Sequence, residues 1–181
     1  MRILSIDSSL GTQVAVVDTA ETAGLPGTCS VQVLSQAEQA DTRRHAESLG
    51  QMLSEALSAP GVADRPLDAV VAATGPAPFT GLRAGLVTAR VVGRTRGIPV
   101  HGVSSLDAVA RLALDELGAR QGEKDPVVLV ATDARRREVY AALFRANGPD
   151  NVTRLTEISV CPPAQVAECI AVQTPEQGSG A

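Results

Sequence analysis

The segment GPAPFTGLRAGLVTARVVG, Gly75 to Gly93, decides the fold because it directly follows an apolar run that we expect to be buried, and because it starts a helix. Pro76 and Pro78 lack an N–H group, which removes donors that a phosphate-binding loop would use. No lysine of the GK[ST] type follows them. Thr80 is placed to cap the helix. The segment therefore predicts a rigid loop that positions a helix, rather than a loop that holds a phosphate.

The helix expected over residues 80–96, ended by Gly97, carries a stripe of small residues. They recur at every fourth position: Gly81, Gly85, Ala89 and Gly93. Each glycine costs about 1 kcal/mol relative to alanine inside a helix, so a stripe is useful where another backbone packs closely. The sequence leaves two possibilities for what packs against this stripe. One is the sheet or first helix of the same chain, and the other is another subunit.

The residues before this segment predict three strands and a helix. Apolar runs over residues 2–7, 12–18 and 29–36 indicate successive strands, which we expect to pair antiparallel. A helix follows, capped by Asp41 or Thr42 and stopped by Pro60 and Gly61. Its apolar positions have helical spacing: Leu49, Met52, Leu53, Ala56 and Leu57. Residues 67–74 are almost all apolar, as in a strand that is buried on both faces.

The residues after it predict a strand over 98–103 and a helix from Ser104 or Ser105 to Gly118. The order is then three strands followed by alternating helices and strands, which suits a mixed sheet of the ribonuclease-H-like kind. Residues 126–148 restart a two-strand pattern, with a third strand expected over 151–160 and a helix over 162–171. We therefore expect an α/β protein with an N-terminal lobe over 1–105 and a C-terminal lobe over 106–181.

Composition excludes several classes of protein. The net charge of the 181 residues is -4, so any contact with nucleic acid has to be local. No apolar run reaches the ~20 residues that cross a bilayer. Cys29, Cys161 and Cys169 lack the spacing of a metal site. We expect three reduced thiols in a cytoplasmic protein that has no membrane segment.

Four motifs carry a resemblance to a known family. ILSIDSS at residues 3–9, RRHAESL at 43–49, the Gly75–Gly93 segment and TDARRREVY at 132–140 occur in the order found in bacterial TsaB proteins. The resemblance covers roughly residues 1 to 145. It implies an actin/Hsp70-like (ASKHA) fold of two ribonuclease-H-like lobes, the second lobe incomplete. Ala77 and Pro78 depart from the small, flexible pair that is usual in the family's loop.

The same resemblance implies a non-catalytic scaffold subunit for threonylcarbamoylation of adenosine in transfer RNA. Its expected partners are the catalytic subunit TsaD and the ATPase TsaE, with a homodimer in isolation and only indirect or weak contact with tRNA. No cofactor is expected. We expect the partner interface on the two long helices, at Leu49, Met52, Leu53, Ala56, Leu57, Leu82, Gly85, Leu86, Ala89 and Gly93.

An alternative function is an actin-like phosphotransferase or ATPase that uses Asp7. In such enzymes an aspartate at a strand end and a turn of small residues face Mg²⁺ and phosphate. The candidate nucleotide residues are Asp7, Ser8, Gly11 and Thr12. An ordinary hairpin explains the same residues. No glycine-rich adenosine loop is present in the C-terminal lobe, and no Ser/His/Asp arrangement supports a peptidase.

Two further groups of residues bear on metal and RNA binding. The family's catalytic subunit holds a metal with two histidines four residues apart, but Leu49 stands four residues after His45, so we expect no metal. The candidate RNA contact is a basic cluster: Arg135, Arg136 and Arg137. A solvated turn is the simpler interpretation of that cluster.

Overall fold

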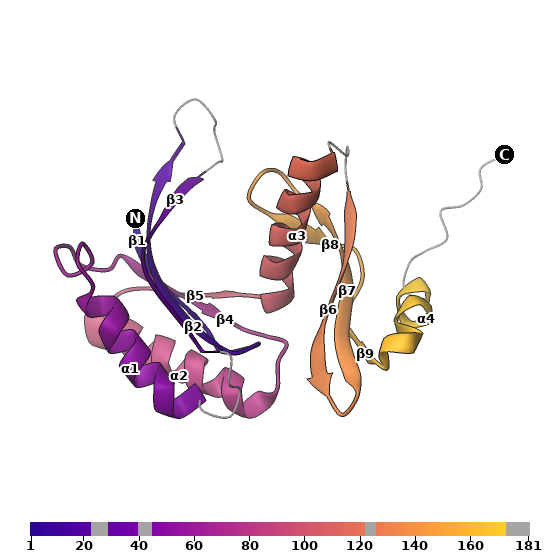
Figure 1. Cartoon of the computed structure of the whole chain (residues 1–181), viewed down its shortest axis with the longest axis horizontal. Helices are drawn as coiled ribbons and strands as arrows, with labels where there is room; N and C mark the ends of the chain where they lie inside the picture. The colour runs from indigo at the N-terminus through magenta and orange to yellow at the C-terminus, as the bar shows by residue number, and fades with distance from the viewer. Residues whose placement is uncertain (23–28, 40–44, 122–125, 173–181) are drawn as a thin grey trace. The chain divides into compact units, whose positions relative to one another are not determined.

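The chain divides into two compact units, Met1–Ser105 and Leu106–Ala181. The computed structural model, drawn in Figure 1, describes residues 1–22, 29–39, 45–121 and 126–172. The helix cap expected at Asp41 or Thr42 lies outside these described residues. Each unit is described by itself below.

The first unit contains a mixed sheet of five strands in the order β3-β2-β1-β4-β5. β1 pairs antiparallel with β2 and parallel with β4, so Ile6 lies beside both Val14 and Ala72. β2 also pairs antiparallel with β3, which confirms the three successive antiparallel strands expected from the sequence. The bounds are β1 Arg2–Asp7, β2 Thr12–Glu21, β3 Cys29–Gln39, β4 Ala69–Ala73 and β5 Val100–Val103.

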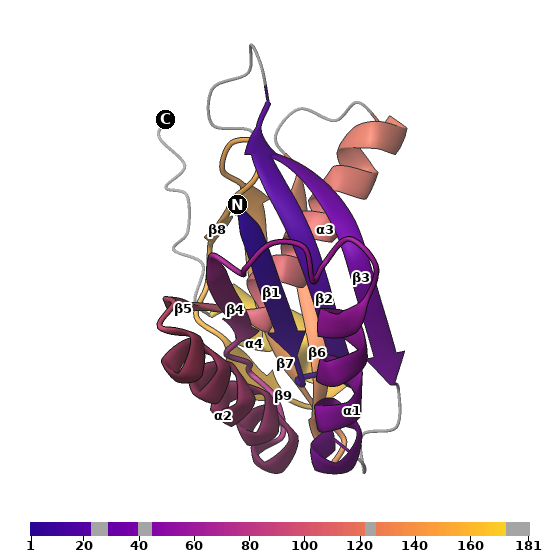
Figure 2. The ribbon, with the colours of Figure 1, turned by 90° about the vertical axis from the view of Figure 1, so that its left-hand side faces the viewer.

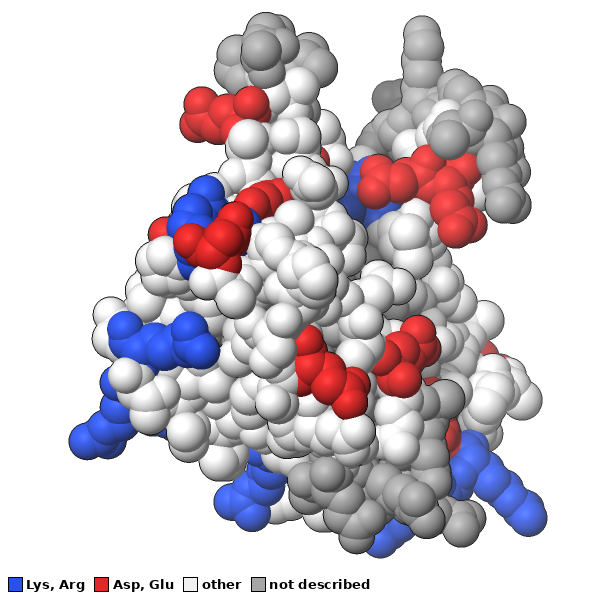
Figure 3. All heavy atoms as spheres, turned by 60° about the vertical axis from the view of Figure 1, so that its left-hand side comes forward, with Lys and Arg blue, Asp and Glu red and all other residues white. Residues whose placement is uncertain are grey.

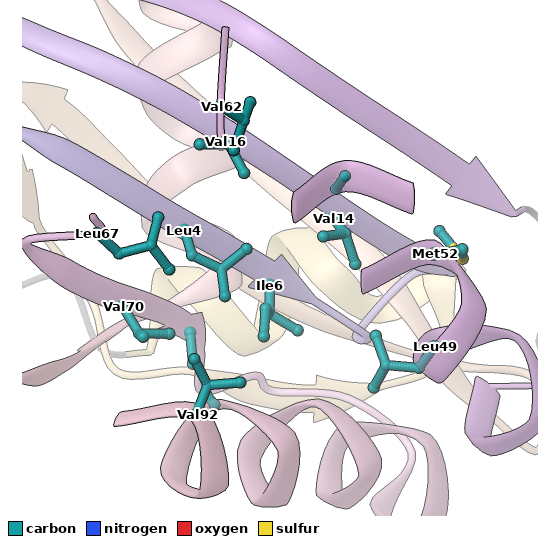
Figure 4. Packing of buried hydrophobic residues seen from close by; sticks show 13 residues of the cluster. Leu4, Ile6, Val14, Val16, Leu49, Met52, Val62, Leu67, Val70 and Val92 are labelled. Atoms are coloured by element: carbon teal, nitrogen blue, oxygen red, sulfur yellow. The ribbon is translucent and has the colours of Figure 1, made fainter. Parts of the chain in front are cut away.

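Two helices, α1 (His45–Ser58) and α2 (Phe79–Arg96), cover one face of this sheet, and they lie side by side in Figure 2. The strands present every second side chain to them, as the two-residue period of a strand requires. Figure 4 shows the resulting core, in which buried leucine, isoleucine and valine side chains of the sheet meet Leu49 and Met52 of α1 and Val92 of α2. Full burial of one such side chain is worth about 1.5–3 kcal/mol.

The ends of α2 are set by backbone-shaping residues. The helix begins at Phe79, and Pro78 occupies the cap position with no side-chain hydrogen bond. The cap expected at Thr80 is therefore wrong, because the cap position lies two residues earlier, at Pro78, whose fixed φ suits the start of a helix. Gly97 ends the helix in the left-handed conformation, with φ 66°, and its N–H bonds to the Gly93 carbonyl.

Arg2 links the loop before β4 to the first two strands through ion pairs and hydrogen bonds. Arg2 is 4% exposed, and its guanidinium donates to both carboxylate oxygens of Asp18, at 3.1 and 2.9 Å, and to Asp64 at 2.6 Å. It also donates to the Val62 carbonyl at 2.9 Å. The hydrogen bonds from Arg2 hold the pKa of Asp18 and of Asp64 below the usual value. Nothing in the periodicity of the sequence indicates this cluster.

The second unit is built on an antiparallel sheet, against which the long helix α3 packs. Leu106, Ala110 and Leu114 of α3 are buried against Val130 and Phe144 of the sheet. The strand order is β6-β7-β8, and β9 pairs with β7 as well. The bounds are α3 Ser105–Gln121, β6 Val127–Arg135, β7 Glu138–Ala146, β8 Val152–Arg154, β9 Ser159–Cys161, the 3-10 helix η1 Pro163–Gln165 and α4 Val166–Ala171.

The single strand expected over residues 151–160 is wrong, because that segment forms β8 and β9. β8 pairs with one end of β7 and β9 with the other. Between them the hydroxyl of Thr156, 6% exposed, accepts the Leu143 N–H at 3.1 Å. The Leu143 carbonyl still accepts the Leu155 N–H at 2.8 Å, but the Leu143 N–H is bound by a side chain in place of a backbone carbonyl, and the strand is interrupted here.

Candidate protein interface

The small-residue stripe of α2 faces the sheet of its own unit. A Cβ at Gly85 would collide with the Ser8 side chain on the sheet side, and one at Gly93 would collide with Val100 of β5. Ala89 between them is fully buried. The sequence allowed the stripe to pack either within its own chain or against another subunit. The structure shows that it packs against the sheet of its own unit.

Six residues expected at the partner interface are buried in the first unit and cannot present a docking surface. Three pack from α1 and three from α2, because helical periodicity identifies an apolar face without saying what covers it. They are Leu49, Met52, Ala56, Gly85, Ala89 and Gly93. The other four are half-buried, so part of each side chain is accessible: Leu53, Leu57, Leu82 and Leu86.

The opposite side of α2 presents apolar and basic side chains to solvent. Phe79, Val87 and Val91 are 68%, 60% and 55% exposed. Arginines alternate with them along the same side, and the Arg83 guanidinium lies 4.3 Å from the centre of the Phe79 ring. Figure 3 turns the helix side of the first unit toward the viewer, where most of the visible surface carries no charge. Large apolar side chains gathered on one exposed face are typical of an interaction surface.

A groove of about 460 Å³ runs between the two helices, lined by Leu49, Gly50, Thr80, Arg83, Ala84, Val87 and Thr88. Gly50 lies on the exposed side of α1, and a Cβ built on it would touch no other residue. Internal packing therefore does not require a glycine there, although it weakens the helix. A bare position beside a groove lets a second helix approach closely.

A second hollow, of about 690 Å³, lies on the other flank of α2 beside the edge strand β5. Its lining is Val87, Arg90, Val91, Gly93, Arg94, Gly97, Ile98 and Val100. Val87 lines both hollows, so the two form one continuous surface across α2. We call this surface the α1–α2 face, and define it by Gly50, Phe79, Arg83, Val87 and Val91.

Asp7 and Ser8, two of the four candidate nucleotide residues, are engaged in internal hydrogen bonds. One Asp7 carboxylate oxygen accepts the Ser9 N–H at 2.7 Å and the Ser9 hydroxyl at 2.6 Å. Ser8 is 2% exposed, and its hydroxyl donates to the Gly81 carbonyl of α2 at 2.9 Å. Thr12 is fully buried, and Gly11 has a φ of 149° in the turn between β1 and β2. These contacts are those of a hairpin that anchors α2.

The basic cluster forms the tip of the β6–β7 hairpin. Arg135 pairs with Glu138, which leaves Arg136 and Arg137 as a two-residue loop. All three arginines have positive φ, at 67°, 53° and 65°, and all are exposed. A two-residue hairpin loop with positive φ at both positions is a type I′ turn, which normally prefers asparagine and glycine. The Arg135 N–H is bound by the Asp133 carboxylate at 2.9 Å.

Two absences hold for the described residues. No group of three or more His, Cys, Asp or Glu side chains is placed there to share a metal ion. No helix in this part of the chain is both long and apolar enough to cross a membrane. His101 is exposed on β5, and His45 begins α1.

Comparison with known proteins identifies relatives along most of the chain. The family described as "TsaD: tRNA N6-adenosine threonylcarbamoyltransferase" matches residues 32–177. An uncharacterised protein of Mycobacterium bovis is 42% identical over 134 residues, which are 72% of this chain and 58% of that protein. A tRNA N6-adenosine threonylcarbamoyltransferase of Rhizobium meliloti is 34% identical over 123 residues, covering 62% of this chain and 34% of the enzyme. The chain thus spans little more than half of the first relative and a third of the second.

Solved structures resemble the whole fold. YeaZ from Pseudomonas aeruginosa superposes with a TM-score of 0.65 at 27% identity, covering 90% of this chain and 68% of that one. A second Pseudomonas aeruginosa structure, described as an uncharacterised protein with similarity to peptidase YEAZ, gives a TM-score of 0.67 at 26% identity. It covers 99% of this chain and 72% of its own.

Proposed function

Because the chain belongs to the TsaD/YeaZ (TsaB) family, which is related to threonylcarbamoyladenosine biosynthesis, we propose that it is a non-catalytic scaffold subunit of the tRNA-modifying complex. In this role it pairs with TsaD, and TsaE joins the pair. Transfer RNA contacts the chain weakly or through these partners. The two units correspond to the lobes of an actin/Hsp70-like protein, over residues 1–105 and 106–181.

One observation carries the proposal: the α1–α2 face exposes large apolar side chains around a bare glycine. Val87 is 60% exposed at the junction of two hollows, where a partner's side chains can be seated on both flanks of α2. The half-buried Leu53, Leu57, Leu82 and Leu86 extend the apolar area. Helices from a partner laid across α1 and α2 would complete a bundle of the four-helix kind.

The positive charge of α2 indicates which residues a partner surface should carry. α2 carries Arg83, Arg90, Arg94 and Arg96, and no acidic residue, among its 18 residues. A fitting partner helix therefore presents apolar side chains flanked by acidic ones. In isolation a second copy of the chain can cover the α1–α2 face instead. Its α1 carries Glu55 on the exposed side, which supplies an acidic side chain for the arginines of α2. We therefore propose a homodimer that gives way to the pair with TsaD.

The test is Val87→Arg, which places a charge at the centre of the α1–α2 face without entering the core. We expect the purified variant to keep its circular dichroism spectrum, to elute as a monomer, and to lose co-elution with TsaD on a sizing column with light scattering. The matched control is Leu112→Arg, because Leu112 is an equally exposed apolar residue, at 62%, on α3 of the other unit. Unchanged co-elution of the Val87 variant would refute the interface.

The scaffold role itself needs a separate measurement, because a protein with this face could also be an enzyme. We expect the isolated chain to show no ATP turnover in the presence of Mg²⁺. The Asp7→Asn variant should behave like the native chain in this assay and in co-elution with TsaD. Turnover that disappears in the Asp7→Asn variant would establish the phosphotransferase or ATPase alternative. The fold of that variant has to be checked, since Asp7 holds Ser9.

A further inference from the structure

Two of the three cysteines lie together in the second unit. Cys161 ends strand β9, and Cys169 lies in helix α4 eight residues later. Both side chains belong to one small core with Ala141, Val166 and Ile170, and Cys169 is a neighbour that interacts with the Cys161 thiol. α4 packs on β7 and β9, so the fold places Cys169 against the same core that buries Cys161.

The environments of the two thiols differ. Cys161 is 4% exposed, whereas Cys169 is only partly covered. Burial raises the pKa of Cys161, and the hydrogen bond to Cys169 and the nearby Glu138 carboxylate raise it further. Cys161 is therefore kept as a neutral thiol, and a reagent from solvent meets Cys169 first. Cys169 is thus the accessible thiol that reacts first, and Cys161 is the protected neighbouring thiol that can then form a disulfide with it.

We propose that Cys161 and Cys169 form a peroxide-responsive dithiol that closes to a disulfide and clips α4 to the sheet of the second unit. In the first step the Cys169 sulfur attacks hydrogen peroxide, the O–O bond breaks, and a sulfenic acid and one water are formed. In the second step the Cys161 sulfur attacks the Cys169 sulfur, the S–O bond breaks, and the sulfenic hydroxyl leaves as water with the Cys161 proton. Two thiols and one peroxide thus give one disulfide and two waters.

The consequence is mechanical and local. α4 has only six residues, so its attachment depends on packing against β7 and β9. A covalent link between Cys161 and Cys169 limits how far this helix can separate from the sheet. The proposal is independent of the scaffold function, because neither cysteine lies on the α1–α2 face.

The experiment uses the full chain with Cys29→Ser, which removes the exposed third thiol and with it the simplest route to cross-linked dimers. The protein is treated with a modest excess of hydrogen peroxide, and free thiols, intact mass and peptide maps are measured. We expect both thiols to disappear, the mass to fall by two hydrogen atoms, and a linked Cys161–Cys169 peptide that dithiothreitol releases. Proteolysis within α4 should slow after oxidation.

Three controls make the result decisive. With Cys161→Ser, Cys169 should be trapped as a sulfenic acid by dimedone, whereas with Cys169→Ser, Cys161 should stay reduced for much longer. In urea the disulfide should form many times more slowly than in the folded chain. A gain of oxygen atoms without the linked peptide, a link between two chains, or equal rates in urea and buffer would each overturn the proposal.

Discussion

The hydroxyl of Ser8 occupies the space that a side chain at Gly85 would need. Ser8 Oγ accepts the Gly85 N–H at 3.2 Å and donates to the Gly81 carbonyl at 2.9 Å, so it joins the end of β1 to α2. The two residues are 77 positions apart in the chain. This close contact explains a glycine in the middle of a helix, where it would otherwise be unfavourable.

We expect Gly85→Ala to destabilise the first unit. Overpacking costs about 1–3 kcal/mol, which exceeds the gain of about 1 kcal/mol that alanine brings to a helix. The Ser8 hydroxyl lies in the way and can rotate aside only by giving up its hydrogen bonds to the Gly81 carbonyl and the Gly85 N–H. The Ser8 Cβ is also closer than an ordinary contact, and it can move only with the backbone. Urea unfolding followed by far-ultraviolet circular dichroism measures the loss.

A double-mutant cycle tests the cause of that loss. Ser8→Gly clears the space on the sheet side, so alanine at position 85 should cost less in the Ser8→Gly background than in the native one. The two changes should be coupled by at least about 0.5 kcal/mol. Additive effects would mean that the contact between Ser8 and residue 85 is not what makes glycine necessary.

Gly50→Ala should have the opposite effect on stability. A Cβ at Gly50 meets no neighbour, so the unfolding free energy should rise by up to about 1 kcal/mol. If a partner helix packs against this position, the same change should weaken binding to TsaD. The matched control is Gly118→Ala in α3, which also meets no neighbour. It should stabilise the second unit and leave TsaD binding unchanged.

Acid should weaken the attachment of the loop before β4. The pKa of Asp18 and of Asp64 is lowered in the folded chain from the usual 3.8, chiefly by hydrogen bonds from Arg2. The stabilisation is therefore complete above the unfolded value and is lost as the pH falls through the lower folded value.

Asp18→Asn should accordingly flatten the dependence of stability on pH between about pH 5 and pH 2. Urea midpoints measured across this range by circular dichroism test this. Asp115→Asn, which removes an exposed ion pair with Arg111 in the second unit, should change the curve little. An unchanged slope for Asp18→Asn would show that Arg2 does not hold this carboxylate in solution.

The β6–β7 turn should become more stable when its arginines are replaced. Arg136 and Arg137 both have positive φ, which costs a residue with a Cβ about 1–2 kcal/mol relative to glycine. Arg136→Asn with Arg137→Gly should raise the unfolding midpoint of the second unit. Tyr140 on β7 is the sole tyrosine of a chain without tryptophan, so its fluorescence reports on this unit.

The same double variant tests contact with RNA by a different readout. If Arg136 and Arg137 contact phosphates, tRNA affinity should fall and its dependence on salt should become less steep. Greater stability with unchanged tRNA affinity would assign the cluster a purely solvent-exposed role. The stability measurement is independent of this outcome, so the two interpretations can be separated.

Local sequence signals predicted most of the elements of the first unit. Runs of alternating and continuous apolar residues located β1, β2, β3 and β4, and Gly97 marked the end of α2. They failed at Thr80, where a preceding proline starts the helix, and over residues 151–160, where Thr156 interrupts the strand. The first failure comes from the backbone geometry of a proline and the second from a side-chain hydrogen bond, and an apolar pattern records neither.

The amino-acid sequence by itself determined the order of strands and helices in the first unit and the presence of a small-residue stripe on α2, because these depend on local spacing and on backbone freedom. Only the tertiary structure decided that the stripe faces Ser8 and Val100 of its own unit, leaving Val87 outside. It also brought Cys161 to Cys169 and Arg2 to Asp64. The physical reason is that a helix with apolar or small residues on several sides can be buried along more than one of them. The choice is made by the close packing of distant segments, which no local period records.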